Sequence, residues 1–503
     1  MENKNKALKN LGFSVISQVI TIAIGFLLPR LYITSYGSEV NGLLNSLNQL
    51  IVYLSLFEAG IGAVTLQSLY GPVARNDWAK INGVLAATDK YYKRAGTLYF
   101  FSLLALAILY PIAVDSEISA LSIIAATILS GIGNVFMFYC QGKYKLLLQA
   151  EGKNYIITNL TTIISVLTSM AKVILIKMGV NFVIMLAVSL IINLGQVVYI
   201  GFYVKKYPKL NLQVKPDFTS LAQRNYTLVH QLSSLVFNNT DVLVLTLFCG
   251  LKVVSVYSIY KMIVTQLEKI LSAISDSVNF MLGQAFQTDR NRFIKMIDVF
   301  EMVYSTVSFC LFSVALYLFV PFVNLYTADV SDMKYADSTL AVLFVSAALL
   351  TAMRVPMLFT INYAGHFKLT IPQTIIESVL NLTISVLCVS KFGIYGVLLG
   401  TTVALLYRTN DVIIYSNVKI LRRSAAKTYR IHLINIITLL VVEFLFSRLL
   451  PKTVESYFAL ILMGIVSVSI SAILFVGMQL MLDKEECMIL IEKIKRDMKR
   501  KRV

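Results

Sequence analysis

The sequence contains few charged side chains for its length. Asp, Glu, Lys and Arg make up 14% of the 503 residues, which is roughly half of the share found in soluble globular proteins. Apolar residues make up 57% of the chain and the mean hydropathy is +0.73. This combination excludes a water-soluble globular fold and a disordered chain, and it predicts an integral membrane protein.

Motifs for enzyme chemistry are also scarce. The five cysteines lie far apart and none belongs to a Cys-x-x-Cys pair, which argues against a zinc site or a disulfide scaffold. No Walker A sequence is present, so ATP is not expected as the direct energy source. The predicted outer loops are short and lack histidine, which disfavours a membrane glycosyltransferase or polymerase. We therefore expect a protein that is not an enzyme and holds no cofactor or metal, with Na⁺ or H⁺ as candidate coupling ions.

Long apolar runs dominate the chain. A membrane-spanning helix needs about 20 mainly apolar residues, because only a fully hydrogen-bonded backbone is stable in hydrocarbon. This criterion predicts an all-α integral membrane protein with 14 transmembrane helices. The expected ranges are 11–33, 40–70, 96–114, 120–140, 156–176, 182–204, 228–248, 253–280, 299–323, 340–364, 369–389, 395–415, 433–450 and 457–482.

The basic residues predict the orientation of these helices. With the N-terminus in the cytoplasm, 33 of the 45 Lys and Arg residues fall in cytoplasmic segments and only six fall in outer loops. Basic residues accumulate on the cytoplasmic side of membrane proteins. Both termini are therefore predicted to be cytoplasmic. The net charge of +18 reflects this topology and favours anionic headgroups over nucleic acid as partners of the basic tail.

Matching residues recur at a nearly constant offset along the chain. The matched pairs are Gly37 and Gly250, Asp77 and Asp289, Pro111 and Pro321, Gly152 and Gly365, and Gly179 and Gly393, with offsets of 210–214 residues. Six predicted helices separate the members of each pair, which indicates two parallel six-helix repeats. The predicted organisation is an N-terminal lobe (1–215), a C-terminal lobe (216–424), and a terminal helix pair with a basic cytoplasmic tail (425–503). Two such lobes around a central cavity are typical of transporters.

Cations within the predicted spans are the candidate substrate-binding residues, because a charge in hydrocarbon normally faces a wet cavity or a partner. Arg30, Lys172, Lys261 and Arg354 have no acidic residue three or four positions away and are expected to hold an anion in the cavity. For Lys172 and Lys261 the alternative is that the side chains extend to the outer headgroups. Arg408 is instead expected to pair with an acid three residues later, Asp411.

A second set of polar residues is the candidate for ion coupling. Glu377 and Asn381 are four residues apart on one helix, and Asp241 follows a run of polar residues. Their oxygen atoms are suited to a sodium or proton site. The alternative is that these residues form a polar contact that holds two helices together.

Five short segments resemble a known family. They are Asn238 to Asp241 (Asn-Asn-Thr-Asp), Val254 to Tyr260, Glu377 to Asn381 followed by Phe392 to Gly396, and Gln149 to Tyr155. Together with the helix number and the two-lobe repeat, they resemble the polysaccharide-transport branch of the multidrug/oligosaccharidyl-lipid/polysaccharide (MOP) exporter superfamily. The resemblance covers essentially the whole chain.

This resemblance implies a Wzx-type flippase that moves an undecaprenyl-diphosphate-linked oligosaccharide from the inner to the outer leaflet of a bacterial plasma membrane by alternating access. It also implies that cavity cations contact the diphosphate, and that membrane lipids and glycan polymerase machinery are candidate partners. Flippases of peptidoglycan precursors carry more arginine in the first two spans, where this chain has Arg30 and Glu58. The alternative is an ion-coupled small-molecule or drug antiporter of the same superfamily.

Overall fold

The computed structural model describes residues 2–58, 61–219, 239–366, 368–451 and 453–482. Throughout these ranges the regular structure is helical and no strand occurs, so the predicted all-α class is confirmed. Two compact units are present, and each is described by itself. The first contains residues 1–258 and 330–333, and the second contains 259–329 and 334–503.

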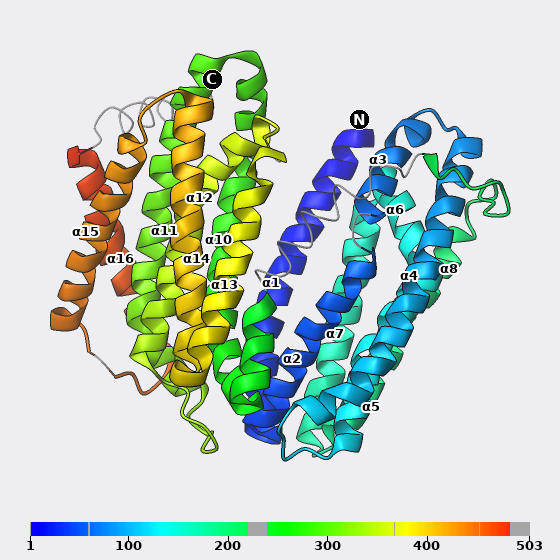
Figure 1. The fold of residues 1–503 in the computed structure, drawn as a ribbon, viewed down its shortest axis with the longest axis horizontal. Coiled ribbons are helices and arrows are strands. Elements are labelled where there is room, and N and C mark those ends of the chain that lie inside the picture. The colour runs from blue at the N-terminus through cyan, green and yellow to red at the C-terminus, as the bar shows by residue number, and fades with distance from the viewer. Residues whose placement is uncertain (1, 59–60, 220–238, 367, 452, 483–503) are drawn as a thin grey trace. The chain divides into compact units, whose positions relative to one another are not determined.

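Figure 1 shows the helices of the first unit, which follow one another along the chain. Its elements are α1 (Glu2–Tyr36), α2 (Ser38–Leu54), η1 (Ser55–Glu58), α3 (Ile61–Ala74), α4 (Trp78–Ala113), α5 (Ala120–Phe136), the π-helix η2 (Met137–Gln141), α6 (Gly142–Ala150), α7 (Asn154–Lys177), α8 (Phe182–Val204) and a short apolar helix, Asn239–Cys249.

The second unit contains most of α10 (Leu251–Thr288), a helix that begins in the first unit. Its further elements are α11 (Arg290–Tyr326), α12 (Ser338–Tyr363), η4 (Lys368–Thr370), α13 (Ile371–Phe392), α14 (Ile394–Tyr415), the π-helix η5 (Ser416–Leu421), α15 (Ala426–Leu449) and α16 (Tyr457–Leu482).

Each of the 14 predicted ranges overlaps a helix among the described residues, and positions 228–238 of the predicted span 228–248 lie outside the described residues. Eleven described helices are long and apolar enough to cross a membrane. One predicted span, 40–70, differs from the structure, because α2 ends at Leu54 in a 3₁₀ turn rather than continuing as one helix. In this turn Glu58 accepts a hydrogen bond of 2.8 Å from the Tyr92 hydroxyl. The exact number of 14 spans, the cytoplasmic termini and the lobe boundaries stay predictions.

The predicted repeat is visible in the backbone. Asp77 caps the N-terminus of α4 by accepting a hydrogen bond from the Lys80 amide at 3.1 Å. Asp289 caps α11 in the same way, with the Arg292 amide at 3.0 Å. The matched glycines also share a left-handed φ that disfavours other residues. The angles are 88° and 82° for Gly37 and Gly250, and 72° and 69° for Gly152 and Gly365.

Each unit has its own apolar core. In the first unit, Tyr92, Tyr99 and Phe138 are almost fully buried and bring α4 against the π-helix η2. In the second unit, Phe309 of α11 packs with Phe446 of α15, so the terminal helix pair α15 and α16 is attached to α11. Between helices in a membrane such aromatic contacts stabilise mainly through close van der Waals packing, because lipid is as apolar as the side chains.

Candidate functional site

Four charged side chains from three helices form a connected cluster inside the second unit. Arg354 of α12 donates from Nη1 to Oε1 of Glu377 on α13 at 2.5 Å. Arg408 of α14 lies 3.6 Å from the other oxygen of Glu377, measured from Nε to Oε2, and it also pairs with Asp411. The Arg354 side chain is 14% exposed and that of Glu377 is 6% exposed. We call these four residues the α12–α14 charge cluster.

The predicted pair of Arg408 and Asp411 is therefore confirmed. Arg354 has no acidic residue three or four positions away on its own helix. Its acidic partner, Glu377, lies on a different helix, 23 residues further along the chain. Two arginines and two acids balance one another in this cluster, which reduces the cost of placing charge in the membrane.

Close packing of α13 against α14 places Glu377 beside the arginines. A Cβ atom at Gly400 would lie 2.4 Å from Ser385 Oγ and 2.9 Å from the carbonyl oxygen of Asn381. Since no side chain fits at this position, glycine allows the two backbones to approach. The Asn381 amide then donates to Thr401 Oγ1 at 2.9 Å. Asn381 and Glu377 thus line one polar face of α13, as their spacing predicts.

Lys261 lies on α10 in the same unit and is partly buried. Its ammonium and the guanidinium of Arg354 both act electrostatically on Glu268, which is seven residues further along α10. The two cations of the second unit that were predicted to bind substrate, Lys261 and Arg354, thus both interact electrostatically with the carboxylate of Glu268.

The other two predicted cations belong to the first unit. Arg30 follows Pro29 inside α1 and is partly buried. Lys172 lies on α7, which packs against α1. The Lys172 ammonium lies 5.7 Å from the centre of the Tyr32 ring, a cation–π distance. Lys172 is thus within the lobe, and no carboxylate hydrogen-bonds to it among the described residues.

Asp241 also lies in the first unit and is only 5% exposed. Its Oδ2 atom accepts a hydrogen bond of 2.9 Å from the Tyr257 hydroxyl. The neighbouring Thr240 shares a hydrogen bond of 3.0 Å with Tyr53. Glu377 and Asn381 belong to the second unit, so a shared ion site for the three predicted residues stays a prediction.

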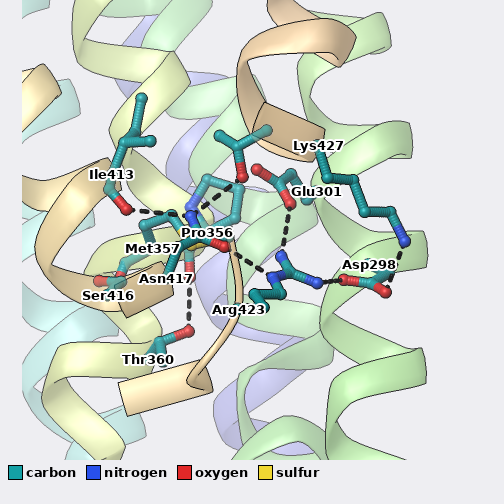
Figure 2. Close-up of polar contacts among 11 residues, drawn as sticks. Asp298, Glu301, Pro356, Met357, Thr360, Ile413, Ser416, Asn417, Arg423 and Lys427 are labelled. Carbon is teal, nitrogen blue, oxygen red and sulfur yellow. Dashed lines mark hydrogen bonds and ion pairs between the residues drawn. The ribbon is translucent and has the colours of Figure 1, made fainter. Parts of the chain in front are cut away.

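A second polar cluster in the second unit was missed by sequence reasoning. Figure 2 shows Arg423 between three partners, and its Nε donates to Asn417 Oδ1 of η5 at 2.6 Å. Its Nη2 lies 3.4 Å from Oε2 of Glu301, which is fully buried on α11. Arg423 also pairs with Asp298, which accepts from Lys427 at 2.7 Å. We call these residues the α11–α15 latch, because they join α11 to the start of α15.

The sequence carries only a weak signal for this latch. Asp298 and Glu301 are three residues apart on one face of α11, which marks a polar stripe. Arg423 and Lys427 lie between the predicted spans 395–415 and 433–450, in a segment that the distribution of basic residues predicts to be cytoplasmic. Arg422 next to them adopts a left-handed φ of 58°, which turns the chain between η5 and α15. Neither the turn nor the partner helix can be read from residue spacing.

Comparison with known proteins gives similarity at the level of structure. No protein-family model matches this sequence, and no curated protein matches it. The chain is similar to the lipid II flippase MurJ in an inward closed conformation, with a TM-score of 0.65 and 14% identity over 92% of this chain and 98% of that chain. It is also similar to an inward-facing multidrug resistance MATE family transporter of the MOP superfamily, with a TM-score of 0.66 and 14% identity over 80% of this chain and 95% of that chain.

A MATE structure in a bent conformation aligns with a TM-score of 0.55 and 14% identity, covering 83% of this chain and 95% of that chain. Identities this low show a shared fold. The class that the fold defines is therefore the fold that these transporter structures share, at TM-scores of 0.65 and 0.66. The described helices and this fold identify a multi-pass membrane protein.

Proposed function

We propose that this protein is a flippase that translocates an undecaprenyl-diphosphate-linked oligosaccharide from the inner to the outer leaflet of a bacterial plasma membrane. The observation that carries the proposal is the similarity to MurJ over 92% of the chain, joined with arginine and lysine side chains inside the helical lobes. A diphosphate cannot cross hydrocarbon without compensating charge, whereas its prenyl chain is stable in lipid.

In the proposed mechanism, Arg30, Lys172, Lys261 and Arg354 bind the diphosphate as the two lobes alternate between inward-open and outward-open states. Guanidinium groups are well suited to this role, because their planar N–H groups bind phosphate oxygens in pairs. Membrane lipids are the other expected partners, and glycan polymerase machinery is the proposed recipient of the translocated product.

The ion pair between Arg354 and Glu377 supplies a specific exchange step. Glu377 neutralises Arg354 at 2.5 Å. When a diphosphate arrives, Arg354 can transfer from the carboxylate to the phosphate, and Glu377 keeps Arg408 as a partner at 3.6 Å. The Glu377 oxygen that Arg354 releases, Oε1, can then bind Na⁺ or H⁺. This step would couple substrate binding to an ion gradient. Asp241 and Asn381 are proposed as further oxygen ligands or proton acceptors.

The terminal helix pair is proposed to hold the prenyl chain. Large apolar side chains of α16 are widely exposed, with Phe458 at 79%, Ile473 at 72% and Met481 at 72%. These side chains face a medium that must be apolar, since exposing them to water is unfavourable. A groove beside α15 and α16 would keep the prenyl chain in lipid while the diphosphate moves through the protein.

Reconstitution tests this proposal. In proteoliposomes loaded with a fluorescent undecaprenyl-diphosphate oligosaccharide, the wild-type protein is expected to equalise the lipid between leaflets. Arg354→Ala is expected to slow this transfer at least tenfold while the helix content stays unchanged. Lys391→Ala is the matched control, because Lys391 is exposed in the last turn of α13. Equal flux in the Arg354 variant and the control would remove Arg354 from the mechanism.

A second candidate function is an ion-coupled antiporter for small molecules or drugs. The similarity to a MATE transporter, at a TM-score of 0.66, favours this alternative. The transported molecule distinguishes the two functions. An antiporter is expected to exchange a cationic dye for Na⁺ or H⁺ in the same proteoliposomes and to leave the lipid-linked oligosaccharide in its original leaflet.

A further inference from the structure

A polar cavity of about 290 Å³ lies inside the first unit, between α2, α5, α7 and α8. Its polar lining includes Asn134, Gln141, Lys172, Ser189, Asn193 and Gln196. The π-helix η2 ends at Gln141, and such π-helical turns are frequent at functional sites. An amide-rich cavity is unexpected in a helix bundle whose other interior residues are mainly apolar.

Lys172 makes this cavity electropositive. The lining contains no Asp or Glu, and the contact of the ammonium with the Tyr32 ring supplies no negative charge. Lys145 lies beside the cavity and donates to Oε1 of Gln196 at 3.4 Å, but Glu58 acts electrostatically on it. No acidic residue of the cavity lining therefore compensates the charge of Lys172. A charge within a membrane-embedded helix bundle normally requires a counter-charge.

Two buried amide atoms also require a partner. Gln141 is 1% exposed and its Nε2 donates to Gln196 Oε1 at 3.3 Å. This leaves Nε2 of Gln196 and Oε1 of Gln141 buried without a hydrogen bond within the described part of the chain. Buried polar atoms in native proteins nearly always have a partner, which can be an ion or ordered water. The Gln196 amide N–H and the Lys172 ammonium are therefore two hydrogen-bond donors at one cavity that can bind an acceptor.

We infer that this cavity, formed around Lys172 and Gln196, binds a small anion that neutralises the lysine within the lobe. The Lys172 ammonium and the Gln196 amide supply charge and hydrogen bonds to the anion. Water that hydrates the anion donates a hydrogen bond to the Gln141 side-chain carbonyl. A cavity of about 290 Å³ has room for a hydrated halide or an inorganic oxyanion. Lys172 is also one of the residues proposed to bind the diphosphate, but this inference concerns anion binding alone and does not require transport.

A phosphate group of a lipid-linked cargo has the same chemistry as a free anion, so the test contains both sources. The full-length protein in detergent is kept in sodium gluconate, which is exchanged for chloride or inorganic phosphate at constant ionic strength while the thermal unfolding midpoint is measured. A separate titration uses farnesyl diphosphate. A saturable rise of Tm is expected in the wild-type protein.

The variants locate the effect at the cavity. Lys172→Gln is expected to weaken the apparent affinity for the anion by about tenfold or more, because a charge-assisted hydrogen bond is lost. Lys172→Arg is expected to retain the response. Lys177→Gln is the matched control, because Lys177 is exposed on the same helix and does not line the cavity. Gln196→Leu should also weaken the response, which keeps the test open if Lys172→Gln fails to fold.

Each outcome decides the inference. A Lys172-dependent rise with inorganic anions supports a free ion as the occupant. A Lys172-dependent rise with farnesyl diphosphate alone supports the anion site and assigns it to the cargo. A response that is absent, or that is equal in wild type and in both Lys172→Gln and Gln196→Leu, overturns the inference. None of these results requires translocation, so failure here is distinguishable from failure of the proposed flippase.

Discussion

Arg354 on α12 and Glu377 on α13 form an ion pair of 2.5 Å inside the second unit. The pair joins two helices through side chains that are 14% and 6% exposed, and Arg408 of a third helix shares the same carboxylate. A compensated cluster of this kind is stable while every member is present, and loss of one member leaves a buried charge without a partner. Glu377 therefore contacts both arginines, and Arg408 also pairs with Asp411.

Replacement of Glu377 by Gln is expected to destabilise the protein by about 3 to 5 kcal/mol, because two guanidinium groups lose their shared carboxylate. Thermal unfolding in detergent measures this effect. The double variant Glu377→Gln with Arg354→Met should be more stable than the single variant, since one uncompensated charge is removed. If the two substitutions simply add, the pair contributes no coupling energy. Glu455→Gln, in an exposed loop, should change the unfolding temperature little.

Gly400 is expected to tolerate no side chain. A Cβ atom there would meet Ser385 Oγ at 2.4 Å, so Gly400→Ala should push α13 and α14 apart and cost about 1 to 3 kcal/mol. Gly201 of α8 has no atom within 4 Å of the equivalent Cβ position, and Gly201→Ala should be neutral or stabilising. Equal unfolding temperatures for the two variants would contradict the close packing of α13 and α14.

These two helices illustrate how much of the site the sequence predicts. The helix ranges, the repeat and the pair of Arg408 and Asp411 follow from hydropathy, matched glycines and a spacing of three residues. The pair of Arg354 and Glu377 does not, because helix periodicity relates neighbours on one helix and says nothing about which helix lies opposite. The close packing of α13 against α14 at Gly400 is equally hard to predict, because a single glycine in a helix has no distinctive sequence signal.

The remaining differences have similar causes. The break after Leu54 falls inside a long apolar run, so hydropathy treats 40–70 as one span although the helix ends there. Lys172 lies on α7, which contains the predicted span 156–176, but the amide-rich cavity beside it is lined by residues of α2, α5, η2, α7 and α8. Such assemblies depend on packing between residues that are distant in the chain.

The α11–α15 latch is expected to stabilise the terminal helix pair. Arg423→Gln removes the cation between Asp298 and the fully buried Glu301, and it should lower stability by roughly 2 to 4 kcal/mol. Arg422→Gln is the control, since this exposed neighbour has the same charge and should change stability by about 0.5 kcal/mol or less. Limited proteolysis near residue 424 should be faster in the Arg423 variant. Equal proteolysis rates would show that Arg423 does not hold α15.

The cap of α12 predicts a dependence on pH. Asp337 accepts hydrogen bonds from the amides of Thr339 and Leu340 at 2.7 and 3.0 Å, and from the Tyr395 hydroxyl at 2.6 Å. Burial alone would raise the pKa of Asp337, but these hydrogen bonds outweigh it and hold the pKa below its usual value.

Since the pKa of the folded state is the lower one, the stabilisation is present above the unfolded pKa of about 4 and is lost as the pH falls through the folded value. Asp337→Ala should cost about 0.5 to 2 kcal/mol at pH 7, and the difference between variant and wild type should shrink below pH 4. Unfolding temperatures from pH 3 to pH 8 measure this, and a constant difference would contradict the role of the ionised carboxylate.

Gradient dependence tests the proposed coupling residues. Asp241→Asn preserves the size of a side chain that is 5% exposed and removes its charge. If Asp241 takes up the coupling ion, transport by this variant should lose its response to an imposed Na⁺ or H⁺ gradient while substrate binding persists. A full gradient response in the variant would assign Asp241 a structural role with Tyr257, its partner at 2.9 Å.

The most direct test of the central claim follows one lipid-linked oligosaccharide across a membrane that contains only this protein. Proteoliposomes are prepared with a fluorescent undecaprenyl-diphosphate oligosaccharide, and a membrane-impermeant quencher reports the fraction in the outer leaflet over time. The account predicts rapid quenching of the inner pool with wild-type protein and a strongly slowed phase with Arg354→Ala. An inner pool that stays protected at the rate of protein-free vesicles would contradict a flippase function.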